Sequence, residues 1–340
     1  MTTAEPIDLP RTQQSAEVLI PAAIAAGAQQ MDASNVHPTH TAHGPESSSP
    51  QERAVSDESS CAANENSFDQ ERHTMANKSG PQYRPWLDIA PPSDYLRNIA
   101  DSATGKGYKS FAKSLLNIKQ GSVVVDLGCG AGLDLPACAA AAGSTGKVIG
   151  IDHDQALLAH AGEYTSHLPT VSIANADIHQ LPLKSGTVDR IRIDRVLQHV
   201  LSPAAVLAEA ARTLRPGGTI VCVEPDWATL AIDHPDVEFS CSYTRHVVAQ
   251  VIRNATIGRA LPRMLTEAGF RVHAIYPITA QWTNAVEADQ VLGFRDVCKH
   301  AVANGALPAA VTKKWIDDLM TGTFFSALTL FIVVAHVEGT

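Results

Sequence analysis

The stretch VVVDLGCGAG, residues 123–132, decides the fold class of this chain. Its first residues are apolar and β-branched, as in a short buried strand, and the Ala-rich segment 136–142 that follows is typical of a helix. Gly128, Gly130 and Gly132 allow a tight turn between the two and let a ligand approach the backbone without a Cβ in the way. A strand, a glycine turn and a helix in this order predict the first unit of an α/β sheet.

The same stretch carries an acid, and two further acids follow later strands. Asp126 precedes the first glycine by two positions, Asp152 ends the apolar segment 147–152, and Asp177 follows the segment 171–174. A carboxylate at the end of the second strand can accept hydrogen bonds from both ribose hydroxyls of an adenosine. We expect Asp177 to accept a hydrogen bond from the adenine amino group.

The glycine spacing distinguishes this loop from a dinucleotide-binding loop. The GxGxxG pattern of such loops requires a third glycine at position 133, where this chain has Leu133. A buried Asp126 beside a pyrophosphate would be electrostatically unfavourable, whereas beside the ammonium of a methionine group it would be favourable. Binding of NAD is therefore the minor interpretation.

The rest of the chain continues the strand–helix alternation. Strands are expected at 123–126, 147–152, 171–174, 188–193, 219–224, 271–275 and 324–335, and helices at 108–117, 136–142, 155–165 and 204–214. Seven strands fit one sheet with helices on both faces. Residues 234–258 and 284–321 fall outside the alternation, and we expect them to be helical insertions. Because they follow late strands, we expect them near the carboxyl edge of the sheet, where open α/β folds bind ligands.

Composition separates the first 80 residues from the rest. They are rich in Ser and polar residues, and the first aromatic residue of the chain is Phe68. A segment without large apolar side chains cannot offset the entropy lost on ordering, so residues 1–80 are expected to be a disordered tail. The catalytic domain is expected over residues 81–340, beginning with a helix after the sequence PPSD (residues 91–94).

Charge and cysteine usage limit the partners. The formal net charge is −9, which argues against nucleic-acid binding because that would need a concentrated positive field. Six cysteines without metal-type spacing indicate isolated thiols in a reducing compartment, so a cytoplasmic location is expected. The apolar run 324–335 is too short to cross a bilayer as a helix, and no metal site is predicted. The oligomeric state is left open.

Five pieces of the sequence together resemble the class I S-adenosylmethionine-dependent methyltransferases. They are VVVDLGCGAG (123–132), VIGIDHD (148–154), NADIHQLPL (175–183), VDRIRIDRVLQHV (188–200) and LRPGG (214–218). The resemblance is greatest to the small-metabolite branch that includes the ubiquinone and menaquinone C-methyltransferases. It implies a Rossmann-like sheet of order 3-2-1-4-5-7-6 and S-adenosylmethionine as the cofactor. Leu133 and Asp134, where the family often has small or polar residues, are a minor departure.

The resemblance also implies roles for individual residues. Asp126 would face the methionine amino group, and Asp152 would bind the ribose. His153 would flank the adenine, while Asp177 and the backbone of Ile178 would read the adenine edge. The remaining expected cofactor residues are the three loop glycines, Gly128, Gly130 and Gly132, and Asp194, which would lie near the sulfonium.

A catalytic base is needed only if the methyl acceptor must lose a proton. The candidates, in order, are His199, Asp226 and His246. A structural or cofactor-shaping role is the favoured interpretation of His199, and a solvated helix face is the favoured interpretation of His246. Trp227 either contacts the sulfonium through cation–π attraction or only packs.

The expected activity is methylation of carbon or oxygen on a small molecule, such as a 2-oxo acid, a quinone or a phenol, in specialised metabolism. A methyltransferase acting on protein or RNA is a second hypothesis. The absence of an Asn/Asp-Pro-Pro-Tyr motif after the fourth strand counts against methylation of the amino groups of bases. The third is a non-catalytic protein that binds adenosylmethionine and recruits partners through its tail.

Overall fold

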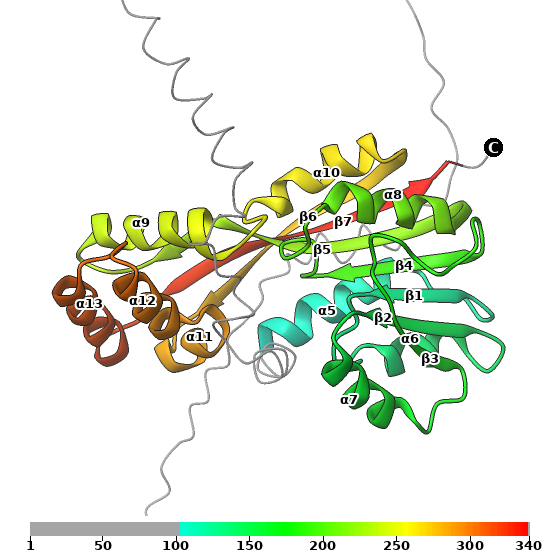
Figure 1. The fold of residues 1–340 in the computed structure, drawn as a ribbon, viewed down its shortest axis with the longest axis horizontal. Helices are drawn as coiled ribbons and strands as arrows, with labels where there is room; N and C mark the ends of the chain where they lie inside the picture. Colours follow the sequence, from blue (N-terminus) through cyan, green and yellow to red (C-terminus); the bar gives the residue numbers. More distant parts are fainter. Residues whose placement is uncertain (1–102, 339–340) are drawn as a thin grey trace, which may run out of the picture. The chain divides into compact units, whose positions relative to one another are not determined.

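Seven strands form one sheet in the order β3-β2-β1-β4-β5-β7-β6 (Figure 1). The strands are β1 (Val123–Leu127), β2 (Lys147–Asp152), β3 (Val171–Asn175), β4 (Val188–Asp194), β5 (Leu214–Ile232), β6 (Phe270–Trp282) and β7 (Ser326–Val337). Pairing is parallel from β3 through β5, and β7 runs antiparallel to both of its neighbours. The predicted strand order is confirmed.

This computed structural model describes residues 103–338. Its helices are α5 (Ala103–Leu115), α6 (Leu135–Ala142), α7 (Gln155–Thr165), α8 (Pro203–Thr213), α9 (Val237–His246), α10 (Ile257–Glu267), α11 (Ala285–Leu292), α12 (Phe294–Ala303) and α13 (Ala309–Thr321), with a short π-helix, η1 (Val247–Val251), after α9. The expected tail 1–80 and the helix expected after residues 91–94 lie outside the described residues. Within the described part, no helix is long and apolar enough to cross a membrane.

Local sequence explains where several helices begin. The side chain of Asp154 accepts hydrogen bonds from two backbone N–H groups at the start of α7. Ser202 caps α8 in the same way, and Pro203 follows it in the first turn, where its missing N–H costs nothing. These caps account for the close agreement between the predicted and observed starts of both helices.

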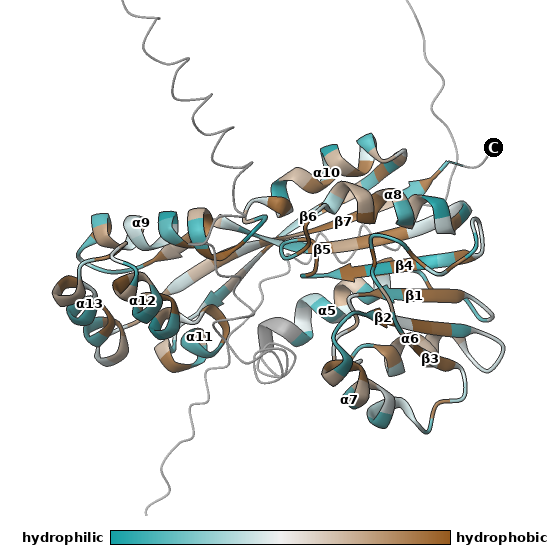
Figure 2. Cartoon of the chain, viewed as in Figure 1, coloured by the Kyte–Doolittle hydropathy of each residue, from teal (hydrophilic) through white to brown (hydrophobic). Residues whose placement is uncertain are grey.

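The central strands are buried on both faces, so their side chains alternate between two cores. Val124 and Val148 face α6, whereas Val125 and Ile149 lie in the core formed with α8 and α10. Strands buried in this way appear as brown arrows through the middle of Figure 2, between helices that carry one hydrophilic side. Helices therefore cover both faces, as predicted.

Strands β5 and β6 are longer than the sequence suggested, whereas β7 has the expected length and is shifted by two residues. The pairing of β5 with β4 ends at Val223, but β5 continues to Ile232. The part of β5 after Asp226 pairs only with β7. Strands β5, β7 and β6 therefore extend past the carboxyl end of β4. Helix α9 packs on β5 and α11 packs on β6, with α12 and α13 beside α11 (Figure 1). The segments 234–258 and 284–321 are thus helical as expected. They pack on this extension, next to the carboxyl edge rather than directly over it.

The extension has its own apolar core, which includes Leu230, Trp282 and Trp315. Aromatic rings from the two insertions meet there, with Tyr243 of α9 5.1 Å from Trp315 of α13 between ring centroids. The two segments 234–258 and 284–321 therefore stabilise each other although they are separated by α10 and β6 in the sequence.

Candidate cofactor and active site

The glycine loop after β1 has the backbone that only glycine adopts without strain. Gly128, Gly130 and Gly132 have φ of 73°, 52° and 74°. A Cβ on Gly128 would lie 2.4 Å from the Cγ2 of Val196, and one on Gly132 would lie 2.9 Å from the Cβ of Ala161. The three glycines of the motif are therefore required by conformation, and at two of them also by close packing.

Asp152 at the end of β2 joins this loop to the second strand. One carboxylate oxygen accepts a hydrogen bond from the backbone N–H of Gly130 at 2.8 Å, and the other accepts from the N–H groups of His153 and Asp154. Its side chain is 10% exposed, so the carboxylate still reaches the surface of the site. The structure brings the glycine loop and this acid together, as the ribose-binding arrangement requires.

The residues expected around the adenine differ in exposure. The imidazole of His153 is 85% exposed, and its Nδ1 lies 3.4 Å from Asp152. Asp177 is also exposed and accepts hydrogen bonds from the backbone N–H and the ring of His179, which hold its pKa below the ordinary value. Ile178 is buried against the core behind the loop. The carboxylate of Asp177 thus has a partner within the chain.

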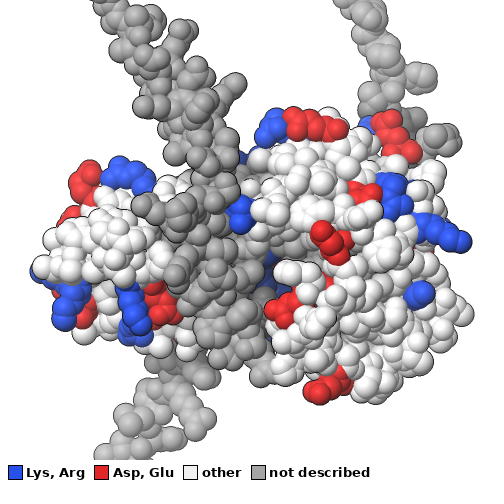
Figure 3. Space-filling view, in the orientation of Figure 1, with Lys and Arg blue, Asp and Glu red and all other residues white. Residues whose placement is uncertain are grey.

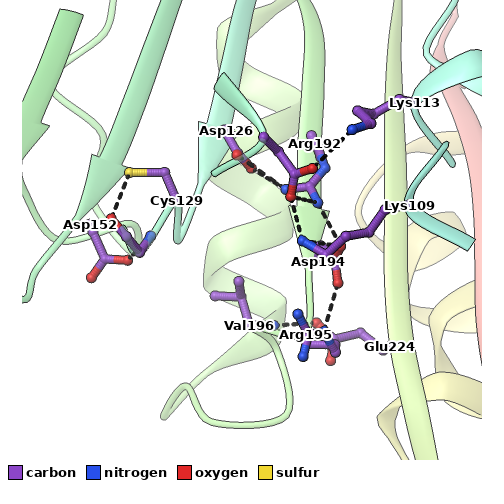
Figure 4. A network of polar contacts seen from close by, with 12 residues as sticks. Lys109, Lys113, Asp126, Cys129, Asp152, Arg192, Asp194, Arg195, Val196 and Glu224 are labelled. Carbon is purple, nitrogen blue, oxygen red and sulfur yellow. Dashed lines mark hydrogen bonds and ion pairs between the residues drawn. The ribbon is translucent and has the colours of Figure 1, made fainter. Parts of the chain in front are cut away.

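Arg192 of β4 lies at the centre of a buried ionic cluster that the sequence analysis missed (Figure 4). Its guanidinium donates to both oxygens of Asp126 at 2.9 and 3.1 Å, to Asp134 at 2.8 Å and to Asp194 at 2.5 Å. Lys109 and Lys113 of α5 also bind Asp134. Asp126, expected to face a ligand ammonium, instead has a full ion pair inside the protein.

The pairing of Asp126 with Arg192 follows from strand register. The two residues are directly opposite each other on the neighbouring parallel strands β1 and β4, so their side chains share a face. Burial raises the pKa of Asp126 to about 6, although Arg192 acts in the opposite direction. For Asp134, burial is outweighed by Arg192 and Lys109, and its pKa lies below the usual range.

Asp194, at the end of β4, is expected near the sulfonium and has several partners. Besides Arg192, it accepts from Nε of Arg195 at 3.0 Å and from the hydroxyl of Tyr108 at 3.3 Å. Burial would raise its pKa, but Arg192 and Arg195 hold it below the ordinary value. Arg195 has φ of 58°, a backbone conformation that is rare for a residue with a side chain and that clusters at functional sites.

His199, the first candidate base, is partly buried after β4. Burial, followed by the charges of Arg195 and Arg253, lowers its pKa to about 4. A histidine with that pKa is neutral at pH 7 but is a weak proton acceptor. The lowered pKa favours the interpretation that His199 shapes the site.

The other two candidate bases lie in different surroundings. Asp226 is fully buried on β5, and both of its oxygens bind the guanidinium of Arg259, so its carboxylate is closed off from an acceptor. His246 ends α9, is 7% exposed, and has no hydrogen-bond partner at Nε2. Burial, and then the charge of His300, lowers its pKa. Trp227 donates its indole N–H to the side-chain oxygen of Gln198 at 2.8 Å, so this N–H has its partner within the protein.

Figure 3 shows a hollow near the centre of the described surface, with acidic and basic side chains both present at its walls. Over this face the two signs are interspersed rather than gathered into one field. Among residues 103–338 no group of three or more His, Cys, Asp or Glu side chains is placed to hold a metal ion.

A seven-stranded sheet of this order, with an acid near the end of β1, three glycines after that strand and a carboxylate at the end of β2, defines the class I methyltransferases. Comparison with known proteins agrees. Residues 125–222 match the family described as a methyltransferase domain. An uncharacterized 37.1 kDa protein in transposon TN4556 of Streptomyces fradiae is 45% identical over 271 residues, which cover 79% of this chain and 77% of that protein.

A demethylmenaquinone methyltransferase of Staphylococcus aureus is 30% identical over 150 residues, 44% of this chain and 62% of that protein. The chain therefore spans less than two thirds of that relative. A solved structure of a SAM-dependent methyltransferase from Aquifex aeolicus is similar with a TM-score of 0.41 and 17% identity, covering 78% of this chain and 97% of that one. The chain belongs to the class I S-adenosylmethionine-dependent methyltransferases, and S-adenosylmethionine is its cofactor.

The described residues fit this cofactor. The positive φ angles of Gly128, Gly130 and Gly132 turn the backbone tightly at the end of β1, and no side chain projects from these three positions toward a ligand. Asp152 presents a carboxylate fixed by three backbone N–H groups, which suits the two hydroxyls of a ribose. The positive charge of Arg192 is paired with the carboxylates of Asp126, Asp134 and Asp194, and Lys109 of α5 also pairs with Asp134. A cationic sulfonium beside this cluster would therefore not face an unpaired positive charge at Arg192.

Proposed function

We propose that the protein transfers a methyl group from S-adenosylmethionine to a carbon or oxygen atom of a small metabolite, such as a 2-oxo acid, a quinone or a phenol, in specialised metabolism. The observation that carries the proposal is the hydrogen bond from Gly130 N–H to Asp152, which fixes the glycine loop against the ribose-binding acid. A small acceptor is supported by the similarity to the demethylmenaquinone methyltransferase. A cytoplasmic location is part of the proposal and rests on the unpaired cysteines.

When bound, the cofactor supplies a methyl group attached to a sulfonium, and transfer of that methyl group leaves a neutral thioether. The acceptor atom forms its bond to the methyl carbon as the bond to sulfur breaks, so no acid is needed for the leaving group. Holding the acceptor in line contributes about 7–11 kcal/mol in well-oriented systems. We therefore propose that the residues of this chain bind the cofactor and orient the acceptor. They remove a proton only where the acceptor must lose one.

The proposed cofactor residues are the glycine loop, Asp152 at the ribose, and His153, Asp177 and Ile178 at the adenine. Asp126 and Asp194 are proposed to act with Arg192, as the charged wall beside the methionine end of the cofactor. For the proton, His246 keeps an unpartnered ring nitrogen and His199 is neutral at pH 7. His246 is therefore the first proposed base and His199 the second, and Asp226 is assigned to support Arg259.

Calorimetric titration with S-adenosylhomocysteine tests the cofactor site. The unaltered protein should bind, and Asp152→Ala should bind much more weakly because it loses both the ribose contact and the support of Gly130. Asp236→Ala is a matched control, because it likewise removes an acid that caps a helix, but at the start of α9. Absence of binding to the unaltered protein would refute the proposal. Screening small acceptors with a labelled methyl donor tests the substrate class, and labelling only of protein or RNA would contradict it.

A further inference from the structure

Glu224 is a carboxylate that the proposed reaction does not use. It lies on β5, is fully buried, and receives hydrogen bonds from three consecutive backbone N–H groups. The donors are Val196 at 2.8 Å, Leu197 at 2.6 Å and Gln198 at 3.3 Å. Three amides of the segment after β4 therefore converge on one side chain, as Figure 4 shows for Val196.

The same segment is held from its other side by Asn254. The amide group of Asn254 donates to the carbonyls of Leu197 at 2.7 Å and Val200 at 2.8 Å, and its backbone N–H donates to Gln198 at 3.0 Å. Glu224 thus satisfies N–H groups and Asn254 satisfies carbonyls of one short segment, residues 196–200. Buried backbone groups need such partners, so this segment has one defined conformation.

Val196 connects this segment to the glycine loop. Its side chain occupies the space next to Gly128, where a Cβ would lie 2.4 Å from Cγ2 and 2.8 Å from Cγ1. Gly128 in turn donates its N–H to the carbonyl of Ile151, at the end of β2. Because protein interiors are closely packed, a displacement of the Val196 side chain by even a few tenths of an ångström must also displace Gly128, the first glycine of the loop.

We propose that Glu224 is a positioning residue for the cofactor site: by fixing the backbone of residues 196–198 it places Val196 against Gly128 and so sets the glycine loop. The inference rests on the proposed cofactor role of that loop. It assigns to Glu224 no contact with cofactor or acceptor. Its effect reaches the site only through Val196.

Two variants and one control test the inference. Glu224→Ala removes all three acceptors, whereas Glu224→Gln keeps an oxygen for the N–H groups of Val196 and Leu197. Asp236→Ala is the control, because its carboxylate likewise accepts a backbone N–H, from Phe239, but at the start of α9. Hydrogen exchange of peptides covering 127–132 and 195–200 is measured beside calorimetric affinity for S-adenosylhomocysteine.

Glu224→Ala should speed exchange in both peptides and weaken binding by about 10–100-fold, the usual effect of removing a supporting partner. Glu224→Gln should restore most of the affinity and leave only the N–H of Gln198 exchanging faster. Asp236→Ala should change neither peptide and leave the affinity unchanged, even if its melting temperature falls.

Unchanged exchange at 127–132 in Glu224→Ala would overturn the inference, whatever happens to affinity. If Glu224→Ala does not fold, Glu224→Gln decides, and unaltered exchange at 195–200 in that variant would also overturn it. Failure of the unaltered protein to bind S-adenosylhomocysteine would instead refute the proposed function, while the exchange data would still report on Glu224 and Gly128.

Discussion

The guanidinium of Arg192 donates to both carboxylate oxygens of Asp126, at 2.9 and 3.1 Å, across two neighbouring strands of the sheet. Asp126 belongs to the glycine motif, and Arg192 lies 66 residues later. Both side chains are nearly completely buried. In this chain, Asp126 of the glycine motif is therefore part of an ionic cluster in which Asp134 and Asp194 also pair with Arg192.

Removing the cation from this cluster should destabilise the protein strongly. Arg192→Met leaves three carboxylates buried together with only Arg195 and the lysines of α5 to balance them, and breaking a buried pair typically costs about 3–5 kcal/mol. Urea unfolding measures the loss. Arg263→Met, at an exposed pair with Glu267, should change stability by no more than about 0.5 kcal/mol. A loss below about 1 kcal/mol in Arg192→Met would contradict the role given to the cluster.

A methyl group at Gly128 should abolish tight cofactor binding. Gly128→Ala adds both the left-handed backbone strain of about 1–2 kcal/mol and a collision with Val196. Gly186→Ala is the matched control, since Gly186 has φ of 67° but nothing within 4 Å of the added atom. Calorimetry should show at least a tenfold weaker affinity for S-adenosylhomocysteine in the first variant only. Equal affinities would show that the contact is not needed.

Stability should fall as pH rises from about 6 to 8. Burial raises the pKa of Glu224 to about 8 from an ordinary value of 4.5, so between these values the folded state holds a proton that the unfolded state has lost. Its favourable contribution is complete below the unfolded pKa and is lost as pH rises through the folded pKa, by at most about 1.4 kcal/mol per pH unit. Denaturant unfolding at several pH values measures this.

In Glu224→Gln this group no longer titrates. Its stability should be less steep against pH between 6 and 8 than that of the unaltered protein, with Asp126 contributing in both proteins at lower pH. Parallel curves for the two proteins would mean that Glu224 is ionised throughout this range.

The imidazole of His199 should stay neutral down to pH 5. Its pKa of about 4 follows from burial and from the nearby charges of Arg195 and Arg253. NMR titration of the ring protons, assigned by comparison with His199→Gln, should show no midpoint between pH 5 and 8. His153, whose imidazole is exposed to solvent, is the comparison histidine in the same spectra. A midpoint near pH 6.5 would restore His199 as the first candidate base.

Local sequence determined much of this protein. The glycine motif and the strand–helix alternation predicted a seven-stranded α/β sheet, because each depends on residues close together in the chain, and the family resemblance implied the strand order. The lengths of β5 and β6 were underestimated. Their extension is stabilised by packing against α9 and α11–α13, and that packing depends on contacts between residues far apart in sequence.

The partners of the motif's own charged residues were decided by the tertiary structure. No residue near Asp126 in the sequence predicts its pairing with Arg192. The two residues are in contact only because the register of the parallel strands β1 and β4 places them side by side. The buried charge at position 192, between Ile191 and Ile193, was the one available sign of such a partner. In the same way, Glu224 meets the backbone of 196–198 only when β4 and β5 pair. The sequence by itself determined which ligand class the loop suits, because that depends on local backbone and spacing. Only the tertiary structure decided which side chains support the loop, because hydrogen bonds and ion pairs act over a few ångströms between distant segments.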